Sequence, residues 1–89
     1  MKDKKRLAAV AQLACVAIGC GQPGPSTVHH CGTYMGGGRD DRRTISLCWQ
    51  HHLGPEGIDG KRMGKRVWEA RYGTEEELLK ITDQLLGMP

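Results

Sequence analysis

Three cysteines and one histidine in this sequence have the spacing of a metal site. Cys15 and Cys20 enclose four residues, and Cys48 and His51 enclose two. Two ligand pairs from separated segments are the usual arrangement of a closed tetrahedral zinc site. The first pair alone is a weaker signal, because Cys15 is also consistent with a small buried residue on a helix. Together, the two pairs predict a structural zinc site.

The other three histidines lie close to these residues in the sequence. His29 and His30 are adjacent, and His52 directly follows His51. Successive side chains of a strand point to opposite faces, so His29 and His30 would have different surroundings on a strand. Successive residues of a helix point about 100° apart, so His52 can face the strand while His51 faces the cysteines. We therefore expect one histidine of the first pair to reach a metal and the other to act on a substrate.

Positioning these side chains requires a helix, two strands and a second helix. Apolar spacing predicts the first helix over about 4–14, followed by a tight glycine-rich turn over 15–25. β-branched residues predict short strands over 26–30 and 44–47, joined by a loop with three consecutive glycines. Another helix is expected over about 48–54.

The C-terminal part is expected to form two further helices. The first, over 65–72, places Trp68 and Tyr72 on one face and ends at a glycine. Thr74 and Glu77 have the spacing of a capping box, which begins a last helix. That helix is expected to run to about Leu86 and to bury Leu78, Ile81, Leu85 and Leu86.

The composition fits a small domain that needs more than a hydrophobic core. The chain has 89 residues, 13 glycines and no phenylalanine, and domains of this size often depend on a metal, disulfides or a partner. Composition alone leaves open whether the cysteines form two disulfides or bind metal, but their pairing with histidine favours metal. We expect a single α+β domain over 1–89, with a zinc knuckle and ββα core over about 15–54 and a helical part over about 64–87.

The N-terminal segment and the net charge bear on location and partners. "KDKKR" followed by "LAAVAQLACVAIGC" resembles a secretory or lipoprotein signal, but Gln12 interrupts the apolar run and Asp3 lies in the basic start. No stretch approaches the ~20 apolar residues of a membrane-spanning helix. The net charge of +3 is a mild tilt toward anionic partners. We expect a cytoplasmic protein without membrane contact, and a secreted lipoprotein is the alternative.

Beyond these local patterns, the chain resembles the HNH endonucleases, and more narrowly the phage Ref-like, RecA-dependent nucleases. The resemblance lies in "VHH", a glycine-rich loop, an aspartate ahead of "TISLC", then "LCWQHH" and "WEARYGTEEELL". It covers about residues 13–86. It implies a ββα-metal fold, DNA as substrate, a RecA-coated filament as partner, and a bacterial or phage-encoded protein.

The resemblance also implies roles for five residues around the histidine pairs. His30 matches the general base that activates water, and Asp41 matches an aspartate that would orient it. His29 and His52 match ligands of a catalytic divalent metal such as Mg²⁺ or Mn²⁺. Asp59 stands where relatives often carry histidine, so it is either a third ligand or an ordinary loop residue.

The structural zinc ligands of the family match the four residues named first, with a wider spacing in the upstream pair. The chain departs from the family at the middle asparagine of the HNH motif, because Arg43 lies near its place. Arg39, Arg42 and Arg43 flank the motif and are expected to bind phosphates.

The expected function is therefore metal-dependent hydrolysis of DNA phosphodiester bonds by an HNH endonuclease. The alternative, from a different class, is a non-catalytic zinc-binding module that binds nucleic acid or protein. The missing asparagine favours this alternative. The three histidines outside the predicted zinc site favour the nuclease.

Overall fold

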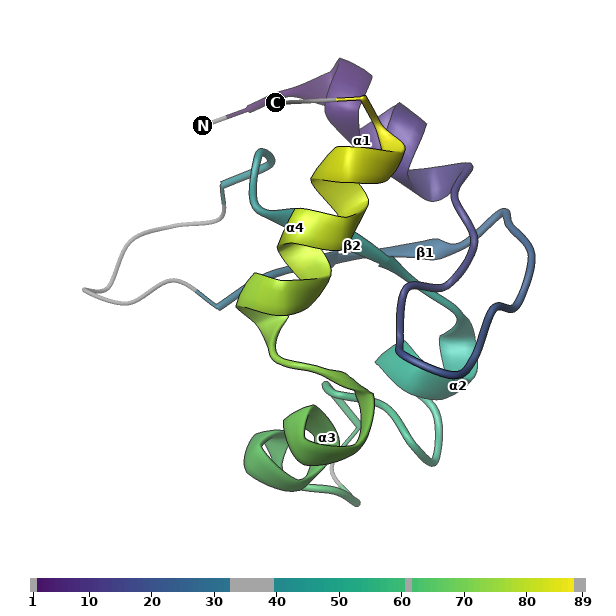
Figure 1. The fold of residues 1–89 in the computed structure, drawn as a ribbon, viewed down its shortest axis with the longest axis vertical. Coiled ribbons are helices and arrows are strands. Elements are labelled where there is room, and N and C mark those ends of the chain that lie inside the picture. The colour runs from purple at the N-terminus through teal and green to yellow at the C-terminus, as the bar shows by residue number, and fades with distance from the viewer. Residues whose placement is uncertain (1, 33–39, 61, 88–89) are drawn as a thin grey trace.

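A two-stranded antiparallel sheet lies at the centre of the fold, with helices around it (Figure 1). The computed structural model describes residues 2–32, 40–60 and 62–87. Along the chain the elements are α1 (Lys4–Ala11), β1 (Thr27–His30), β2 (Thr44–Leu47), α2 (Trp49–His52), α3 (Lys65–Tyr72) and α4 (Glu75–Leu85). The described chain is a small α+β structure. None of its described helices is long and apolar enough to span a membrane.

The register of the sheet separates the first histidine pair. His29 pairs with Ile45, and His30 pairs with Thr44. Because neighbours on a strand point to opposite faces, His29 is buried whereas His30 is only half-buried. All four residues of β2 are buried. The strand expected over 44–47 is confirmed, and the strand expected over 26–30 begins one residue later.

The first helix ends three residues earlier than expected. Asp3 caps its start by accepting a hydrogen bond from the main-chain N–H of Arg6. After Ala11 the chain turns, and the carbonyl of Ala11 accepts a hydrogen bond from the N–H of Ser26 instead of continuing the helix. Gly24 backs onto this turn, where a Cβ would lie 2.5 Å from the carbonyl oxygen of Gln12. Residues 12–14, which the apolar spacing assigned to this helix, therefore lie outside it.

Arg6 joins the first helix to the sheet and to the last helix. Its guanidinium is buried and donates to the side-chain and main-chain oxygens of Thr44, at 2.9 and 2.8 Å. It also pairs with Asp83 of α4 at 2.7 Å. These charge-assisted hydrogen bonds satisfy a cation that would be costly to bury alone.

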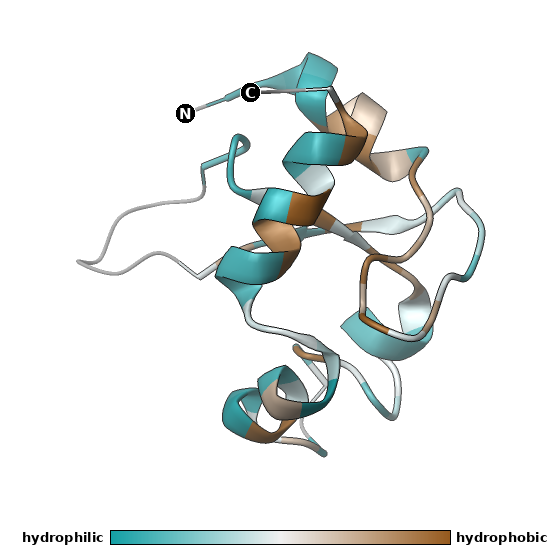
Figure 2. Cartoon of the chain, in the orientation of Figure 1, coloured by the Kyte–Doolittle hydropathy of each residue, from teal (hydrophilic) through white to brown (hydrophobic). Residues whose placement is uncertain are grey.

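The C-terminal helices form as expected, but of the four side chains expected to be buried in the last helix only Leu78 is fully buried. The rings of Trp68 and Tyr72 lie 5.2 Å apart, and Thr74 with Glu77 forms a capping box. Leu78 and its neighbour Leu79 face the core, and Figure 2 shows hydrophobic and hydrophilic segments alternating along α4. Ile81 is partly buried against the core and Leu86 is half-buried.

The expected burial of Leu85 is wrong, since 56% of this residue is exposed. The last turn of α4 lies beyond the two short strands (Figure 1), so nothing in the sheet covers it. Helix α2 is also shorter than expected and ends at His52, because Gly54 turns the chain tightly back against the ring of Trp49.

Candidate metal centres

The three cysteines and His51 come together in one cluster, hereafter the cysteine cluster (Cys15, Cys20, Cys48 and His51). The Sγ atoms of Cys20 and Cys48 are 3.9 Å apart, and the Sγ of Cys15 is 3.9 Å from Nδ1 of His51. All four donor atoms lie within 4.8 Å of one another. With zinc–sulfur bonds of about 2.3 Å, a tetrahedral site places sulfurs about 3.8 Å apart. The cluster could therefore hold a metal ion such as zinc.

Hydrogen bonds between β2 and the chain around Cys15 hold the loop that carries Cys15 and Cys20. The N–H of Val16 donates to the carbonyl of Ser46, and the Ser46 hydroxyl donates to the carbonyl of Ala14. The loop turns at Gly19, whose φ of +89° suits glycine. All four cysteines are free, so the alternative of two disulfides is not what the structure shows.

The helix supplies the other half of the cysteine cluster. Cys48 is the N-cap of α2, and His51 lies one turn later with Nδ1 at 3.1 Å from the Cys48 Sγ. The ring of His51 is buried edge-on against Tyr72, with centroids 4.6 Å apart. Burial raises the pKa of the Cys15 thiol to about 12, so a thiolate at this position needs a nearby cation.

His29, His52 and Asp59 form a second group, hereafter the histidine cluster. Oδ2 of Asp59 lies 3.1 Å from Nδ1 of His29 and 3.1 Å from Nε2 of His52. The two imidazole rings are edge to face with centroids 5.1 Å apart. Main-chain N–H groups of the loop after α2 hold Asp59 in place, since its own N–H donates to the carbonyl of His52.

The contact between His52 and Thr27 shows which ring nitrogen of His52 carries the proton. Nδ1 of His52 is 2.8 Å from the Thr27 hydroxyl, and that hydroxyl donates its only proton to the carbonyl of Leu47 at 2.6 Å. Thr27 must therefore accept from His52, which places a proton on Nδ1. Burial is the main cause that lowers the pKa of His52, and repulsion from a protonated His29 would add to it. In the neutral ring, Nε2 then directs a lone pair toward Asp59, and two imidazoles with a carboxylate are a suitable donor set for a divalent cation.

His30 and Asp41 form a separate pair on the other side of β1. Nε2 of His30 is 2.8 Å from Oδ1 of Asp41. The other oxygen of Asp41 accepts the main-chain N–H of Asp3 at 2.9 Å. This hydrogen bond, together with the one from His30, lowers the pKa of Asp41. An ionised Asp41 orients the His30 ring with its proton on Nε2, which leaves Nδ1 as the basic nitrogen.

Arg42 and Arg43, the two loop arginines that the structure describes, form ion pairs with carboxylates of the protein. Nε of Arg42, which is exposed, is 3.3 Å from Asp40. Arg43 forms an ion pair with Glu76 at the start of α4. Arg39 lies outside the described residues. The expectation that these side chains bind phosphates is thus still a prediction.

Two residues that contact the histidine cluster from outside were not predicted from the sequence. Thr27 lies at the start of β1, and Glu75 lies in the first turn of α4. Oε2 of Glu75 is 2.7 Å from Nε2 of His29. Burial alone would raise the pKa of Glu75, but hydrogen bonds from His29, Lys65 and Gly32 lower it to about 2. No local pattern signals this contact, because Glu75 resembles the other acidic residues of a helix start.

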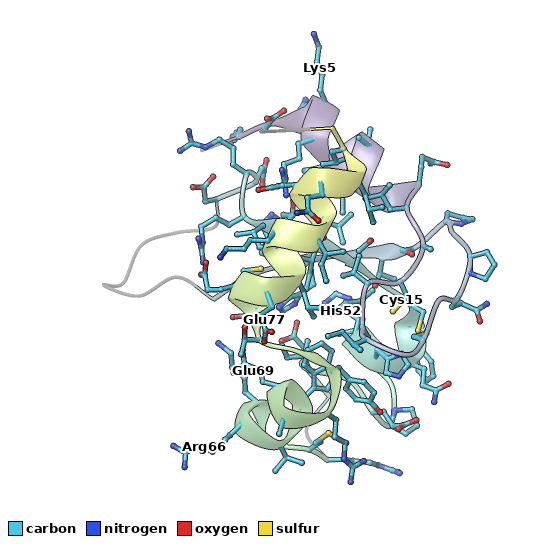
Figure 3. The ribbon with its side chains drawn as sticks, in the orientation of Figure 1. Lys5, Cys15, His52, Arg66, Glu69 and Glu77 are labelled. Carbon is cyan, nitrogen blue, oxygen red and sulfur yellow. The ribbon has the colours of Figure 1, made fainter. Side chains whose placement is uncertain are left out.

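The described residues thus contain two donor clusters and a histidine–carboxylate pair, gathered around one short hairpin and one short helix. Cys15 and His52, from the two clusters, both lie within the body of the fold, whereas Lys5 and Arg66 point outward (Figure 3). No protein-family model, curated protein or solved structure matches this chain.

Proposed function

We propose that this protein is a metal-dependent endonuclease of the HNH type, which hydrolyses DNA phosphodiester bonds. One observation carries the proposal: His51 and His52, neighbours on α2, belong to two different donor clusters. A module that used metal only for stability would need the cysteine cluster alone. The histidine cluster and the His30–Asp41 pair supply donors and a base that such a module would not require.

The cysteine cluster suits a structural role in this proposal. Three sulfurs and one nitrogen form a closed set of four donors, as in structural zinc sites. The ion would fix α2 to the loop over 15–20 and so orient His52. Zinc is the expected metal, because thiolate and imidazole donors together favour it.

The histidine cluster suits a catalytic role. His29, His52 and Asp59 are three donors, which leaves coordination positions for substrate and water. A divalent ion such as Mg²⁺ or Mn²⁺, held by these three residues, would neutralise charge on the phosphate and on the leaving oxygen. The buried rings of His29 and His52 keep these donors in place before the substrate binds.

His30 is the proposed general base. It is half-buried, and Asp41 holds its Nε2 proton, so Nδ1 can accept the proton of an attacking water. His30 follows His29 directly on β1, so the proposed base and one proposed metal ligand lie on the same strand. General-base catalysis of this kind contributes about 10²–10⁴-fold to the rate.

The test is nicking of supercoiled plasmid by the full-length, zinc-loaded chain with added Mg²⁺ or Mn²⁺. The parent should nick in the presence of either ion, and His30→Ala should be slower by about 10²–10⁴-fold while its zinc content and melting temperature stay at the parent values. Lys5→Ala, an exposed substitution on α1, is the control and should nick at the parent rate. A parent without metal-dependent nicking, or a His30→Ala variant as active as the parent, would leave the non-catalytic zinc-binding module as the better conclusion.

A further inference from the structure

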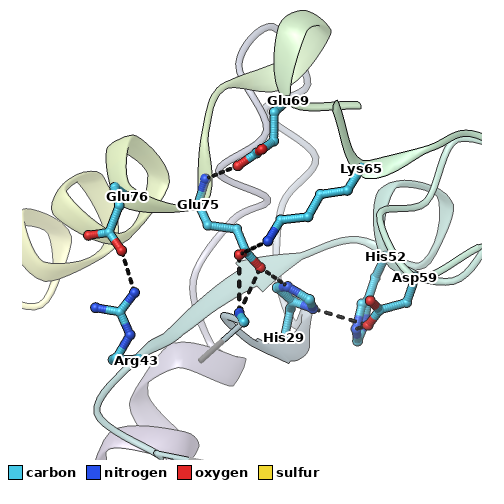
Figure 4. A network of polar contacts seen from close by, with 9 residues as sticks. His29, Arg43, His52, Asp59, Lys65, Glu69, Glu75 and Glu76 are labelled. Atoms are coloured by element: carbon cyan, nitrogen blue, oxygen red, sulfur yellow. Dashed lines mark hydrogen bonds and ion pairs between the residues drawn. The ribbon is translucent and has the colours of Figure 1, made fainter. Parts of the chain in front are cut away.

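Glu75 approaches the histidine cluster from a distant part of the chain. It lies in the first turn of α4, 46 residues after His29, and its carboxylate is buried (Figure 4). Oε2 of Glu75 lies 2.7 Å from Nε2 of His29, on the side of the ring that faces away from Asp59. Thr74 and Glu77 cap α4, so the contact between Glu75 and His29 is not needed for capping. Glu75 is also not part of an exposed acidic surface, because its side chain is buried.

Three donors and the helix start fix the carboxylate of Glu75. The main-chain N–H of Gly32 lies 3.1 Å from both oxygens, and Nζ of Lys65 lies 2.7 Å from Oε1. The main-chain N–H of Glu75 itself donates to Glu69 of α3 at 2.8 Å. The position of the carboxylate is therefore set by β1, α3 and the start of α4 together.

This arrangement determines which nitrogen of His29 carries the proton. An ionised carboxylate only accepts hydrogen bonds, so Nε2 of His29 must donate to Glu75. In the neutral ring, Nδ1 is then left with its lone pair directed at Oδ2 of Asp59, 3.1 Å away. Nε2 of His52 directs a lone pair at the same oxygen, because its Nδ1 proton is held by Thr27.

We propose that Glu75 is a positioning residue, which fixes the orientation and tautomer of His29 and so sets the affinity of the histidine cluster for a divalent cation. This inference rests on the proposed function, in which the cluster binds such a cation. A carboxylate behind a ligating histidine fixes the ring and makes the free nitrogen a better donor, and loss of such a partner typically weakens metal binding about 10–100-fold.

Glu75→Gln tests the role with little change in volume. The amide oxygen can still accept, but the amide NH₂ then faces at least one of the three donors that surround the native carboxylate. Glu76→Gln is the matched control, because it removes the same charge from the same helical turn at a side chain that is exposed and pairs with Arg43 instead. Glu75→Asp is a second variant that keeps the charge on a side chain one methylene shorter.

The experiment measures Mn²⁺ affinity of the zinc-loaded, full-length chain by electron paramagnetic resonance, with zinc content and melting temperature recorded for each variant. Imidazole ¹⁵N shifts of the parent, without added Mn²⁺, report the tautomer of His29 independently of any activity. We expect a parent His29 with its proton on Nε2, a loss of about 10–100-fold in Mn²⁺ affinity for Glu75→Gln, a smaller loss for Glu75→Asp, and parent affinity for Glu76→Gln.

The experiment distinguishes failure of the proposed cation site from failure of the proposed role of Glu75. A parent that binds no Mn²⁺ beyond the zinc site would refute the cation role of the histidine cluster, and with it the proposed function. A parent that binds Mn²⁺ while Glu75→Gln binds it equally well, with zinc and folding intact, would refute only the positioning role. A proton on Nδ1 of His29 in the parent would refute it as well. If Glu75→Gln does not fold, parent affinity in Glu75→Asp decides against the inference.

Discussion

Replacing His51 and His52 separately by alanine tests whether two adjacent residues serve different clusters. Structural zinc contributes about 10–16 kcal/mol in zinc-finger peptides, so an even share for one of four ligands is about 2.5–4 kcal/mol. The ring contact of His51 with Tyr72 adds about 1 kcal/mol, as ring pairs generally do. His51→Ala should therefore lose about 3.5–5 kcal/mol of stability, which is close to the lower end of the range of about 4–13 kcal/mol expected for a chain of 89 residues.

His52→Ala should have a much smaller effect on folding. It removes one hydrogen bond to Thr27, worth about 1 kcal/mol, and the Thr27 hydroxyl keeps its bond to the carbonyl of Leu47. For a domain of this size, 1 kcal/mol corresponds to a melting-temperature shift of about 4–8 °C. We expect a decrease in this range for His52→Ala with one zinc still bound per chain, and for His51→Ala a decrease several times larger with loss of zinc.

The assay combines zinc per chain, by elemental mass spectrometry, with thermal unfolding followed by circular dichroism on the same preparations. If His52→Ala loses zinc while His51→Ala keeps it, the assignment of the two side chains is reversed. If both variants lose zinc equally, the two clusters are not separate metal sites.

Two further predictions concern the bound zinc and the loop arginines. A strong chelator should remove zinc and reduce both the far-UV dichroism and the melting temperature, because metal-binding energy is folding energy in small domains; an unchanged signal in a metal-free sample would contradict a structural role. Double charge reversal of Arg42 and Arg43 to glutamate should weaken DNA binding and reduce the slope of log affinity against log salt by about 2, since each phosphate contact contributes about 0.9. The same change at Lys4 and Lys5 of α1 is the control, and an equal effect there would show that the loop has no special part in binding.

Where short-range signals decide the structure, the sequence predicted it closely. The strand over 44–47 and the helix over 65–72 have the expected bounds, and the capping box of Thr74 and Glu77 is present. Periodicity misplaced the end of the first helix and the burial of Leu85. In both cases the outcome depends on tertiary neighbours, namely the segment that packs against the helix end and the length of the sheet beneath α4.

In the candidate site, too, the features set by local sequence could be predicted, and those set by tertiary contacts could not. The cysteine cluster, and the placement of His51 and His52 on different sides of α2, could be predicted because ligand spacing and helix geometry are local properties. The approach of Asp59 to both histidines agrees with its predicted place, although its role as a ligand stays a prediction. The contacts of Thr27 and Glu75 could not be predicted, because they depend on which segments the fold brings beside the imidazole rings.

Because α2 is short, the affinity of each cluster for its metal ion should depend on whether the other cluster is occupied. A helix of four residues does not persist on its own in water, so its order depends on what holds its ends. If zinc holds that turn, the apparent dissociation constant of the histidine cluster equals its intrinsic constant divided by the fraction of chains with an ordered turn. By thermodynamic reciprocity, a cation at the histidine cluster tightens zinc binding by the same factor. Zinc concentration would then set the magnesium or manganese sensitivity of the protein, although the two ions never share a ligand.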